Sequence, residues 1–319
     1  MTASTDTTAF GSDAPVLSYS PVVLPVAGRP VDLKVRVSAP ATGTDLPVIL
    51  LSHGHGGSNN LSSLNGYGPI ANLWAAAGFV VIQPTHLSSR TLSHQLADNP
   101  RGPLFWQSRA EDMSHILDRL DEIEKSVPQL AGRLDRDKIA VAGHSLGGHT
   151  AGLLLGARST DPDTGEEVNL TEPRIKAGVL LAAPGRGGDI LNGPMAEMVP
   201  FFHTTDFSTM ATPALVVAGD KDDSQHFTDV GPDWHTDPYR LAPAPKTLLT
   251  LFGAGHLLGG ISGYDADETT DENPARVAAL AHLTSAYLRT QFQPCDHAWP
   301  AACEALTTGP DPAGRVESK

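Results

Sequence analysis

The segment KIAVAGHSLGGHTAGLLLGA, residues 138–157, decides how this chain can fold. It begins with a short apolar run typical of a strand buried on both faces, and it ends in a stretch rich in Ala, Gly and Leu that is typical of a buried helix. Between them, Gly143-His144-Ser145-Leu146-Gly147 matches the pattern Gly-x-Ser-x-Gly. This pattern predicts a very tight strand-to-helix turn, whose strained backbone makes the serine hydroxyl project above the sheet. Ser145 is therefore the candidate nucleophile.

The alternation of buried strand and amphipathic helix continues on both sides of this segment. It predicts the α/β class, with a mostly parallel central sheet covered by helices on both faces and an antiparallel N-terminal entry. An insertion over the top of the sheet is expected at residues 185–212. The antiparallel strands at the N-terminus are expected at residues 16–26 and 31–38. Further strands are expected at 46–52, 79–83, 175–182, 214–218 and 247–252. Helices are expected at 70–77, 104–126 and from 273 onwards.

A single domain is predicted for residues 15–292. Residues 1–14 are small and polar and are expected to be a disordered tail, and residues 293–319 are expected to be a C-terminal tail. The C-terminal tail holds the two cysteines of the chain, Cys295 and Cys303. They are interpreted either as two thiols or as a local disulfide that staples the tail, and a disulfide would indicate an oxidising compartment.

The composition argues against several classes of function. With 40% hydrophobic residues, the 319-residue chain can bury a sizeable core. Its formal net charge of −14 argues against a nucleic-acid partner and against docking on anionic membranes, because both need clustered Lys and Arg. No stretch predicts stable membrane insertion, and no signal peptide is recognisable. We expect a cytoplasmic protein, or a secreted one if a signal peptide precedes this sequence.

A serine hydroxyl is a poor nucleophile without a histidine base that is held by a carboxylate, and in the predicted fold the chain order is serine, acid, histidine. His256 is the best candidate for the base, because it follows the last predicted strand in a run of small residues, Gly253-Ala254-Gly255. Three other histidines follow Ser145 in predicted loops: His203, His226 and His235.

The acid is expected just after the penultimate strand, in Gly219-Asp220-Lys221-Asp222-Asp223. The spacing Gly-x-x-Asp, which is common in proteins of the predicted fold, favours Asp222. Asp220 and Asp223 are the alternatives, and the carboxylates that are not used would be solvated loop residues.

Two backbone N–H groups are needed to hold the oxyanion of an acyl-transfer reaction. One is predicted to be that of Leu146, directly after the nucleophile, and the other that of His55, with Gly56 as second choice. His55 lies in the loop SHGHGGS, residues 52–58, whose glycines permit an unusual backbone path. His53-x-His55 also resembles the start of a dinuclear zinc motif, His-x-His-x-Asp-His. The motif fails at residues 57 and 58, so neither metal nor cofactor is predicted.

A substrate pocket is expected beside the nucleophile, with walls from residues 185–212. Apolar and aromatic side chains there suit an acyl chain or an aryl group, and sealing of the core under a loop is the alternative interpretation. The acidic run at residues 264–272 is interpreted as a solvated loop. The candidate pocket residues are His144, Met198, Phe201, Phe202 and His203.

Taken in order, the motifs SHGHGG at 52–57, GHSLGG at 143–148, Gly219-x-x-Asp222 and Gly255-His256 resemble the α/β-hydrolase superfamily over about residues 45–290. Within it, the chain resembles the predicted dienelactone hydrolases, a group close to the platelet-activating-factor acetylhydrolase, chlorophyllase and cutinase-like polyesterase branches. True dienelactone hydrolases use a cysteine nucleophile. Because this chain has Ser145, dienelactone is discounted as the substrate.

The motifs and the resemblance together imply a serine carboxylic-ester hydrolase that works through an acyl-enzyme. The implied partner is a small-molecule or polymeric ester with an apolar acyl or aryl group. A thioesterase, an amidase, or a polyester or phospholipid hydrolase would use the same three residues. The oligomeric state is not predicted.

Overall fold

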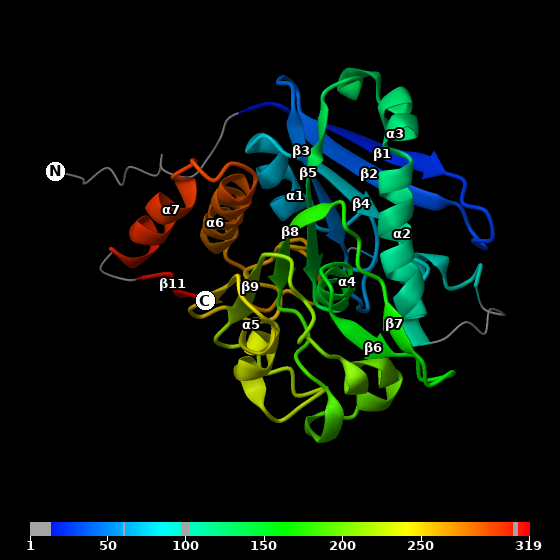
Figure 1. The fold of residues 1–319 in the computed structure, drawn as a ribbon, viewed down its shortest axis with the longest axis vertical. Helices are drawn as coiled ribbons and strands as arrows, with labels where there is room; N and C mark the ends of the chain where they lie inside the picture. Colours follow the sequence, from blue (N-terminus) through cyan, green and yellow to red (C-terminus); the bar gives the residue numbers. More distant parts are fainter. Residues whose placement is uncertain (1–13, 60, 97–102, 309–311) are drawn as a thin grey trace.

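The computed structural model describes residues 14–59, 61–96, 103–308 and 312–319. Its centre is a nine-stranded sheet in which six adjacent strands run parallel, two antiparallel strands precede them at one edge, and one antiparallel strand follows at the other (Figure 1). The expected α/β class and mostly parallel sheet are confirmed. In spatial order the strands are β1 (Val16–Leu24), β2 (Leu33–Pro40), β4 (Val80–Pro84), β3 (Leu46–Ser52), β5 (Leu134–His144), β8 (Ile175–Leu181), β9 (Ala214–Gly219), β10 (Lys246–Leu251) and β11 (Gly314–Ser318).

Helices cover both faces of the sheet, because the central strands are apolar on both sides. Val48 and Leu50 of β3 pack with one layer, whereas Ile49 and Leu51 pack with the other, as the alternation of side chains along a strand requires. The first layer is formed by α2 (Trp106–Asp118), α3 (Leu120–Ser126) and α4 (Leu146–Leu154); the second is formed by α1 (Gly68–Ala76), α6 (Pro274–Phe292) and α7 (Ala298–Thr307).

The C-terminal residues differ from the expected tail. Residues 298–307 form α7, which packs on α6, and β11 pairs with β10 through five register partners from Thr247↔Ser318 to Leu251↔Gly314. The expectation of a tail missed this structure because both elements are short and are ordered by their neighbours: α7 buries Ala302 and Leu306 against α6, and β11 adds to the free edge of β10. Cys295 and Cys303 are free thiols, so the alternative of a local disulfide between them is not formed. Burial raises the pKa of Cys303 to about 11.

Two further details depart from the expectations. The helix predicted at 104–126 is divided at Arg119, whose φ of −122° separates α2 from α3. Its apolar stripe continues across the break, so the periodicity could not reveal it. A small hairpin, β6 (Arg158–Thr160) with β7 (Glu167–Asn169), follows α4 and was not predicted. Residues 1–13 lie outside the described residues, and so does almost all of the expected N-terminal tail.

The expected insertion follows β8 and consists of short 3-10 helices at Gly188–Ile190, Ala196–Met198 and Pro200–Thr204. After β9, a second connection carries the 3-10 helix η7 (Gly231–Thr236) and α5 (Asp237–Leu241). Both connections lie at the lower end of the molecule in Figure 1, where β5 ends. Among the described residues, none of the helices has the length and apolarity that a membrane crossing requires.

Candidate active site

Ser145 occupies the turn between β5 and α4 in a conformation that few non-glycine residues adopt. Its φ is 53° and its ψ is −122°, and its N–H donates to the carbonyl of Leu181 at 3.0 Å. The turn is tight because glycines flank it: a Cβ on Gly143 would collide with the backbone of Gly147, and a Cβ on Gly147 would collide with the backbone of Ser52. The predicted strained turn is therefore present, and it holds α4 directly against the loop after β3.

Asp222 and His256 are brought together from the ends of two neighbouring strands, β9 and β10. The Nδ1 atom of His256 lies 2.7 Å from Oδ2 of Asp222. The carboxylate is 2% exposed, whereas the histidine side chain is 34% exposed. Burial alone would raise the pKa of Asp222, but the charge of His256 and hydrogen bonds from His235 and His256 outweigh it and hold this pKa well below its usual range. Asp222 is therefore a carboxylate at neutral pH.

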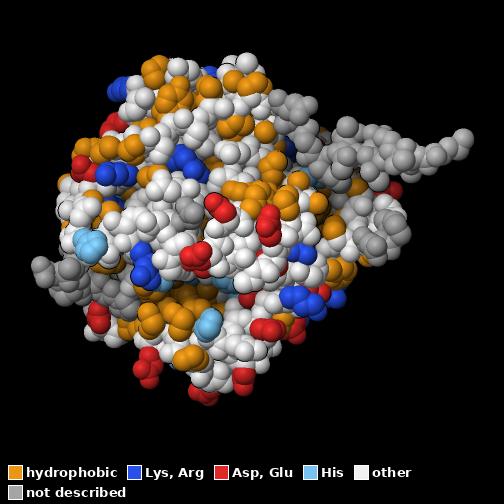
Figure 2. All heavy atoms as spheres, turned by 180° about the vertical axis from the view of Figure 1, so that it is seen from behind, with side chains coloured by type: hydrophobic (Ala, Val, Ile, Leu, Met, Phe, Trp, Pro, Cys, Tyr) orange, Lys and Arg blue, Asp and Glu red, His pale blue; other side chains and the backbone are white. Residues whose placement is uncertain are grey.

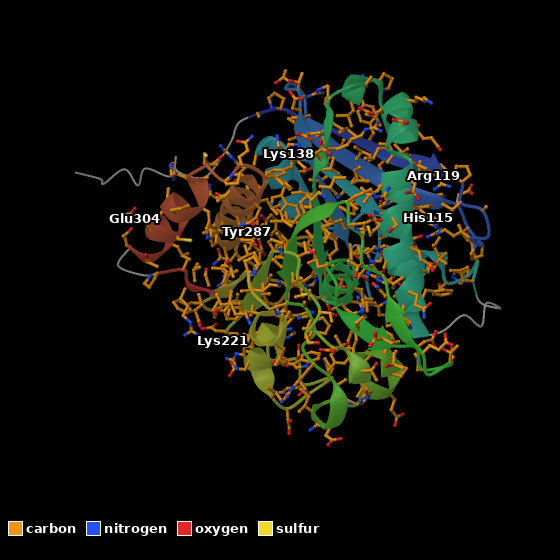
Figure 3. The ribbon with its side chains drawn as sticks, viewed as in Figure 1. His115, Arg119, Lys138, Lys221, Tyr287 and Glu304 are labelled. Atoms are coloured by element: carbon orange, nitrogen blue, oxygen red, sulfur yellow. The ribbon has the colours of Figure 1, made fainter. Side chains whose placement is uncertain are left out.

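The two alternative acids are engaged or solvated elsewhere. Asp220 accepts a hydrogen bond from the N–H of Gly253 at 2.7 Å, and Asp223 is exposed. Lys221, which lies between them, is found at the lower end of the molecule in Figure 3, whereas Lys138 at the start of the apolar part of β5 lies at the opposite end. The residues that were predicted to act together thus gather where the parallel strands end.

His144 links the turn of Ser145 to the loop that carries His256. Its Nε2 lies 2.8 Å from the carbonyl of His256, which can only accept, so Nε2 carries the hydrogen. Its Nδ1 therefore accepts from the hydroxyl of Tyr67 at 2.8 Å, and the Tyr67 oxygen accepts from the N–H of Gly54 at 2.8 Å. Burial lowers the pKa of His144 to about 3, so the ring is neutral. His144 is fully buried and is not the pocket residue that was predicted; it positions the neighbouring loops.

The hydroxyl of Ser145 makes no hydrogen bond to any residue that the structure describes. A hydrogen bond between Ser145 and His256 is therefore not formed in this conformation. Contacts between a nucleophile and its base commonly tighten only when the substrate is bound. The turn and the base are nevertheless neighbours, since the rings of His144 and His256 have centroids 4.9 Å apart.

Both predicted oxyanion donors are unpaired. Within the described residues, neither the N–H of Leu146 nor that of His55 has a hydrogen-bond acceptor. The two loops lie against each other, because a Cβ on Gly54 would be 3.2 Å from Nδ1 of His144. Burial, followed by the charge of Arg109, lowers the pKa of His55 to about 4, which keeps its ring neutral beside the site.

A buried polar array behind this loop was not predicted. Ser52 Oγ lies 3.0 Å from Nε2 of His86, and Nδ1 of His86 lies 2.9 Å from Oδ2 of Asp112. Asp112 accepts two hydrogen bonds from Arg29, at 2.9 and 3.2 Å. At the other end of the array, Arg109 donates a hydrogen bond to Ser52 Oγ at 3.2 Å. These residue types are common throughout the chain, and no local pattern marks them as partners.

The same array fixes the backbone of the loop that carries His55. Arg109 donates to the carbonyl of His53 as well as to Thr150 Oγ1 on α4, the latter at 3.0 Å. The ring of His53 is held on both sides, by the N–H of His86 at 3.1 Å and by the carbonyl of Gly54 at 2.7 Å. The backbone before His55 is therefore held in a fixed position by buried groups.

The acidic run at residues 264–272 is not simply solvated, as had been expected. Glu268 accepts from the N–H and the hydroxyl of Ser58, both at 2.7 Å, and thereby holds the end of the loop after β3. Asp271 accepts from the N–H groups of Gly255 and Gly259, at 2.8 and 3.0 Å, on either side of His256. The run thus holds both the loop after β3 and the loop that carries His256. Its partners are backbone groups, which the sequence could not identify.

The predicted pocket residues separate into two groups. Phe201 and Phe202 are buried in a cluster with Trp106, whose ring stacks on Phe201 at 5.4 Å, and with Leu146, which follows the nucleophile. Met198 is 49% exposed and His203 is exposed, and neither belongs to this cluster. Figure 2 shows a hollow lined by hydrophobic side chains, with histidine side chains beside it, at the lower end of the molecule.

His235, one of the candidate histidines of the sequence, also contacts Asp222, which the sequence did not indicate. His235 Nε2 lies 3.0 Å from Oδ2 of Asp222, the same oxygen that contacts His256. Among the described residues, Asp222, His235 and His256 form a group whose ligand atoms lie within 4.8 Å of one another, as in some metal sites. Both N···O distances are hydrogen-bond lengths, which leave no space for an ion between the atoms. We therefore interpret the group as a hydrogen-bonded cluster.

Compared with models of known protein families and with curated protein sequences, the chain matches none.

Proposed function

We propose that the protein is a serine carboxylic-ester hydrolase of the α/β-hydrolase fold that works through an acyl-enzyme. The observation that carries the proposal is the 2.7 Å hydrogen bond between His256 and the buried Asp222, next to a strained serine turn. Asp222 uses Nδ1 of His256, so Nε2 is the nitrogen that faces the reaction. The order serine, acid, histidine along the chain supports the same assignment.

In the proposed reaction, Ser145 attacks the ester carbonyl and His256 takes the hydroxyl proton on Nε2. Asp222 holds the ring and stabilises its charged form, while the unpaired N–H groups of Leu146 and His55 bind the oxyanion. His256 then passes the proton to the leaving alcohol. Water, activated by the same ring, hydrolyses the acyl-enzyme and regenerates the serine. The pKa values of His144 and His55, about 3 and about 4, make these two rings poor proton carriers at neutral pH.

The apolar cluster that includes Leu146 supports an ester with an apolar acyl or aryl group. A panel of nitrophenyl esters of increasing acyl length, with matched thioesters, amides, a polyester and a phospholipid, would define the substrate class. Fastest turnover of a carboxylic ester is expected. Faster turnover of the thioester or amide would reassign the reaction while keeping the same three residues.

A fluorophosphonate probe tests the nucleophile directly, since it labels an activated serine covalently. The wild-type protein should be labelled on the peptide that contains Ser145, and Ser145→Ala should abolish labelling. Asp222→Asn should slow labelling strongly, whereas Asp223→Asn, one residue away and exposed, is the matched control and should label normally. Labelling of another serine, or equal rates in the two Asn variants, would contradict the proposal.

A further inference from the structure

His235 is a second, buried histidine on the carboxylate of the proposed acid. It belongs to η7, is 1% exposed, and lies at hydrogen-bond distance from Asp222. Asp222 Oδ2 is shared, at 3.0 Å from Nε2 of His235 and 2.7 Å from Nδ1 of His256. The two imidazole rings have centroids 5.7 Å apart. A charge on one ring is therefore felt by the other.

The hydrogen-bond partners of His235 assign the hydrogens of its ring. Nδ1 lies 2.8 Å from the carbonyl of Ala183, which can only accept, so Nδ1 carries a hydrogen. Ser224 donates its single hydroxyl hydrogen to Oδ1 of Asp222 at 2.9 Å. Nε2 of His235 lies 2.8 Å from the Ser224 oxygen and 3.0 Å from the carboxylate, and both can only accept here. With the hydrogens placed in this way, Nε2 faces only acceptors, which favours a doubly protonated, positively charged ring.

A neutral ring would fit these contacts poorly. Its Nε2 lone pair would face the carboxylate oxygen at 3.0 Å, and Ser224 would have to leave Oδ1 of Asp222 in order to donate to it. Both changes remove favourable contacts from a buried carboxylate, which is costly in a low-dielectric environment. The doubly protonated ring satisfies every contact at once.

Three titratable groups from other segments lie near this ring. His256 comes from the loop after β10, His144 from β5, and Asp222 from the loop after β9. On the connection that carries His235 itself, Asp233 and Asp237 are directed to Arg240 and Arg186. Among the described residues, Asp222 is therefore the carboxylate that is hydrogen-bonded to His235.

We propose that His235 is a positioning residue that shares Asp222 with His256 in its charged form and thereby weakens the proton affinity of the base. The inference rests on the proposed function, because it assigns His256 as the base. The positive ring partly cancels the charge of Asp222 at His256, so His256 remains a free base at a lower pH. The hydrolase would accordingly keep its activity further into the acidic range than a site with one histidine on the acid.

Two substitutions separate the charge from the hydrogen bond. His235→Asn keeps an N–H donor but cannot be charged, and His235→Phe removes both. In each variant, the midpoint of the acidic limb of the pH–rate profile for a nitrophenyl ester should rise by about one pH unit. His235→Phe should also lose about tenfold in kcat, because Asp222 loses a partner that orients it. His115→Phe, on α2 away from the site in Figure 3, should match the wild type.

A purely structural role for His235 would lower kcat at every pH and leave the acidic limb in place, and that result would overturn the proposal. Nitrogen NMR of ¹⁵N-histidine protein gives a readout that needs no turnover. At pH 7 the His235 signals, identified by their loss in His235→Phe, should show two protonated ring nitrogens. One unprotonated nitrogen would refute the charged ring even if the esterase assignment holds, whereas two protonated nitrogens in an inactive protein would refute only the esterase assignment.

Discussion

Among the described residues, the array around Ser145 and the array around Ser52 combine the same residue types, serine, histidine and aspartate, but differ in exposure and strain. In one, Ser145, His256 and Asp222 lie at the carboxyl ends of the parallel strands, with a strained serine and a histidine that is one-third exposed. In the other, Ser52, His86 and Asp112 are linked by hydrogen bonds of 3.0 and 2.9 Å and are fully buried.

Residue types and hydrogen bonds alone therefore do not make a catalytic site. The buried array is the more completely bonded of the two, because Arg29 and Arg109 satisfy its ends. Its serine is unable to meet a substrate, and its histidine has no free nitrogen. In the exposed array the serine hydroxyl and two N–H groups are without partners among the described residues. A substrate can bind to groups that have no partner in the protein. Leaving such groups unpaired lowers the stability of the fold, and the buried array helps to offset this loss by holding the loop after β3.

Replacing the two serines should separate the arrays most sharply. Ser145→Ala should lower kcat for a nitrophenyl ester by about 10⁴-fold or more and leave the urea midpoint nearly unchanged, since it removes the proposed nucleophile, a half-buried hydroxyl that is not hydrogen-bonded to any described residue. Ser52→Ala should have the opposite profile. It leaves Nε2 of His86 without its donor, so it should lower the free energy of unfolding by about 1–2 kcal/mol, with less than a tenfold loss of kcat. Comparable losses of kcat in both variants would erase the distinction.

Replacing the two aspartates should likewise lower activity in one array and stability in the other. Asp222→Asn should reduce kcat by about 10³–10⁴-fold, because the amide favours the wrong tautomer of His256. Asp112→Asn should leave the buried Arg29 without its charged partner and lower the free energy of unfolding by about 3–5 kcal/mol. Urea unfolding and initial rates, measured on both variants, check the pair. A stable Asp112→Asn protein would show that the buried array does not support the fold.

The sequence predicted the exposed array because each of its members follows an apolar strand in a distinctive loop. Ser145 lies in a five-residue pattern, and Asp222 and His256 each follow a glycine after a strand. The buried array has no such signal: Ser52 ends one strand, His86 follows another, and Asp112 lies within a helix. Such residues meet only because the sheet order places β3 beside β4 and packs α2 on the same face.

Other errors have equally physical causes. A motif defines the position of His144 but not the direction of its side chain, which turns inward to Tyr67 instead of lining a pocket. The carboxylates of Glu268 and Asp271 look solvated in an acidic run, because their partners are backbone N–H groups from distant loops. His235 appeared among the candidate histidines of the sequence. Its role depends on the path of the connection after β9, which no pattern describes.

The smallest expected effect concerns the buried histidines, which differ from His256 in being sealed from water. Burial lowers the pKa of both His144 and His149 to about 3, compared with an ordinary value near 6.5. Between these values the unfolded chain binds the proton and the folded chain does not, so each ring makes stability fall as the pH decreases, by about 1.4 kcal/mol per pH unit. His149 can be replaced without breaking a strong bond, because its one hydrogen bond, to Ser159, is 3.3 Å long. In urea unfolding at pH 6, 5 and 4, His149→Phe should reduce the pH dependence of the free energy of unfolding by about 1.4 kcal/mol per pH unit. His149→Gln should flatten it equally despite its poorer packing, and an unchanged slope in both variants would show that the ring is already protonated in the fold.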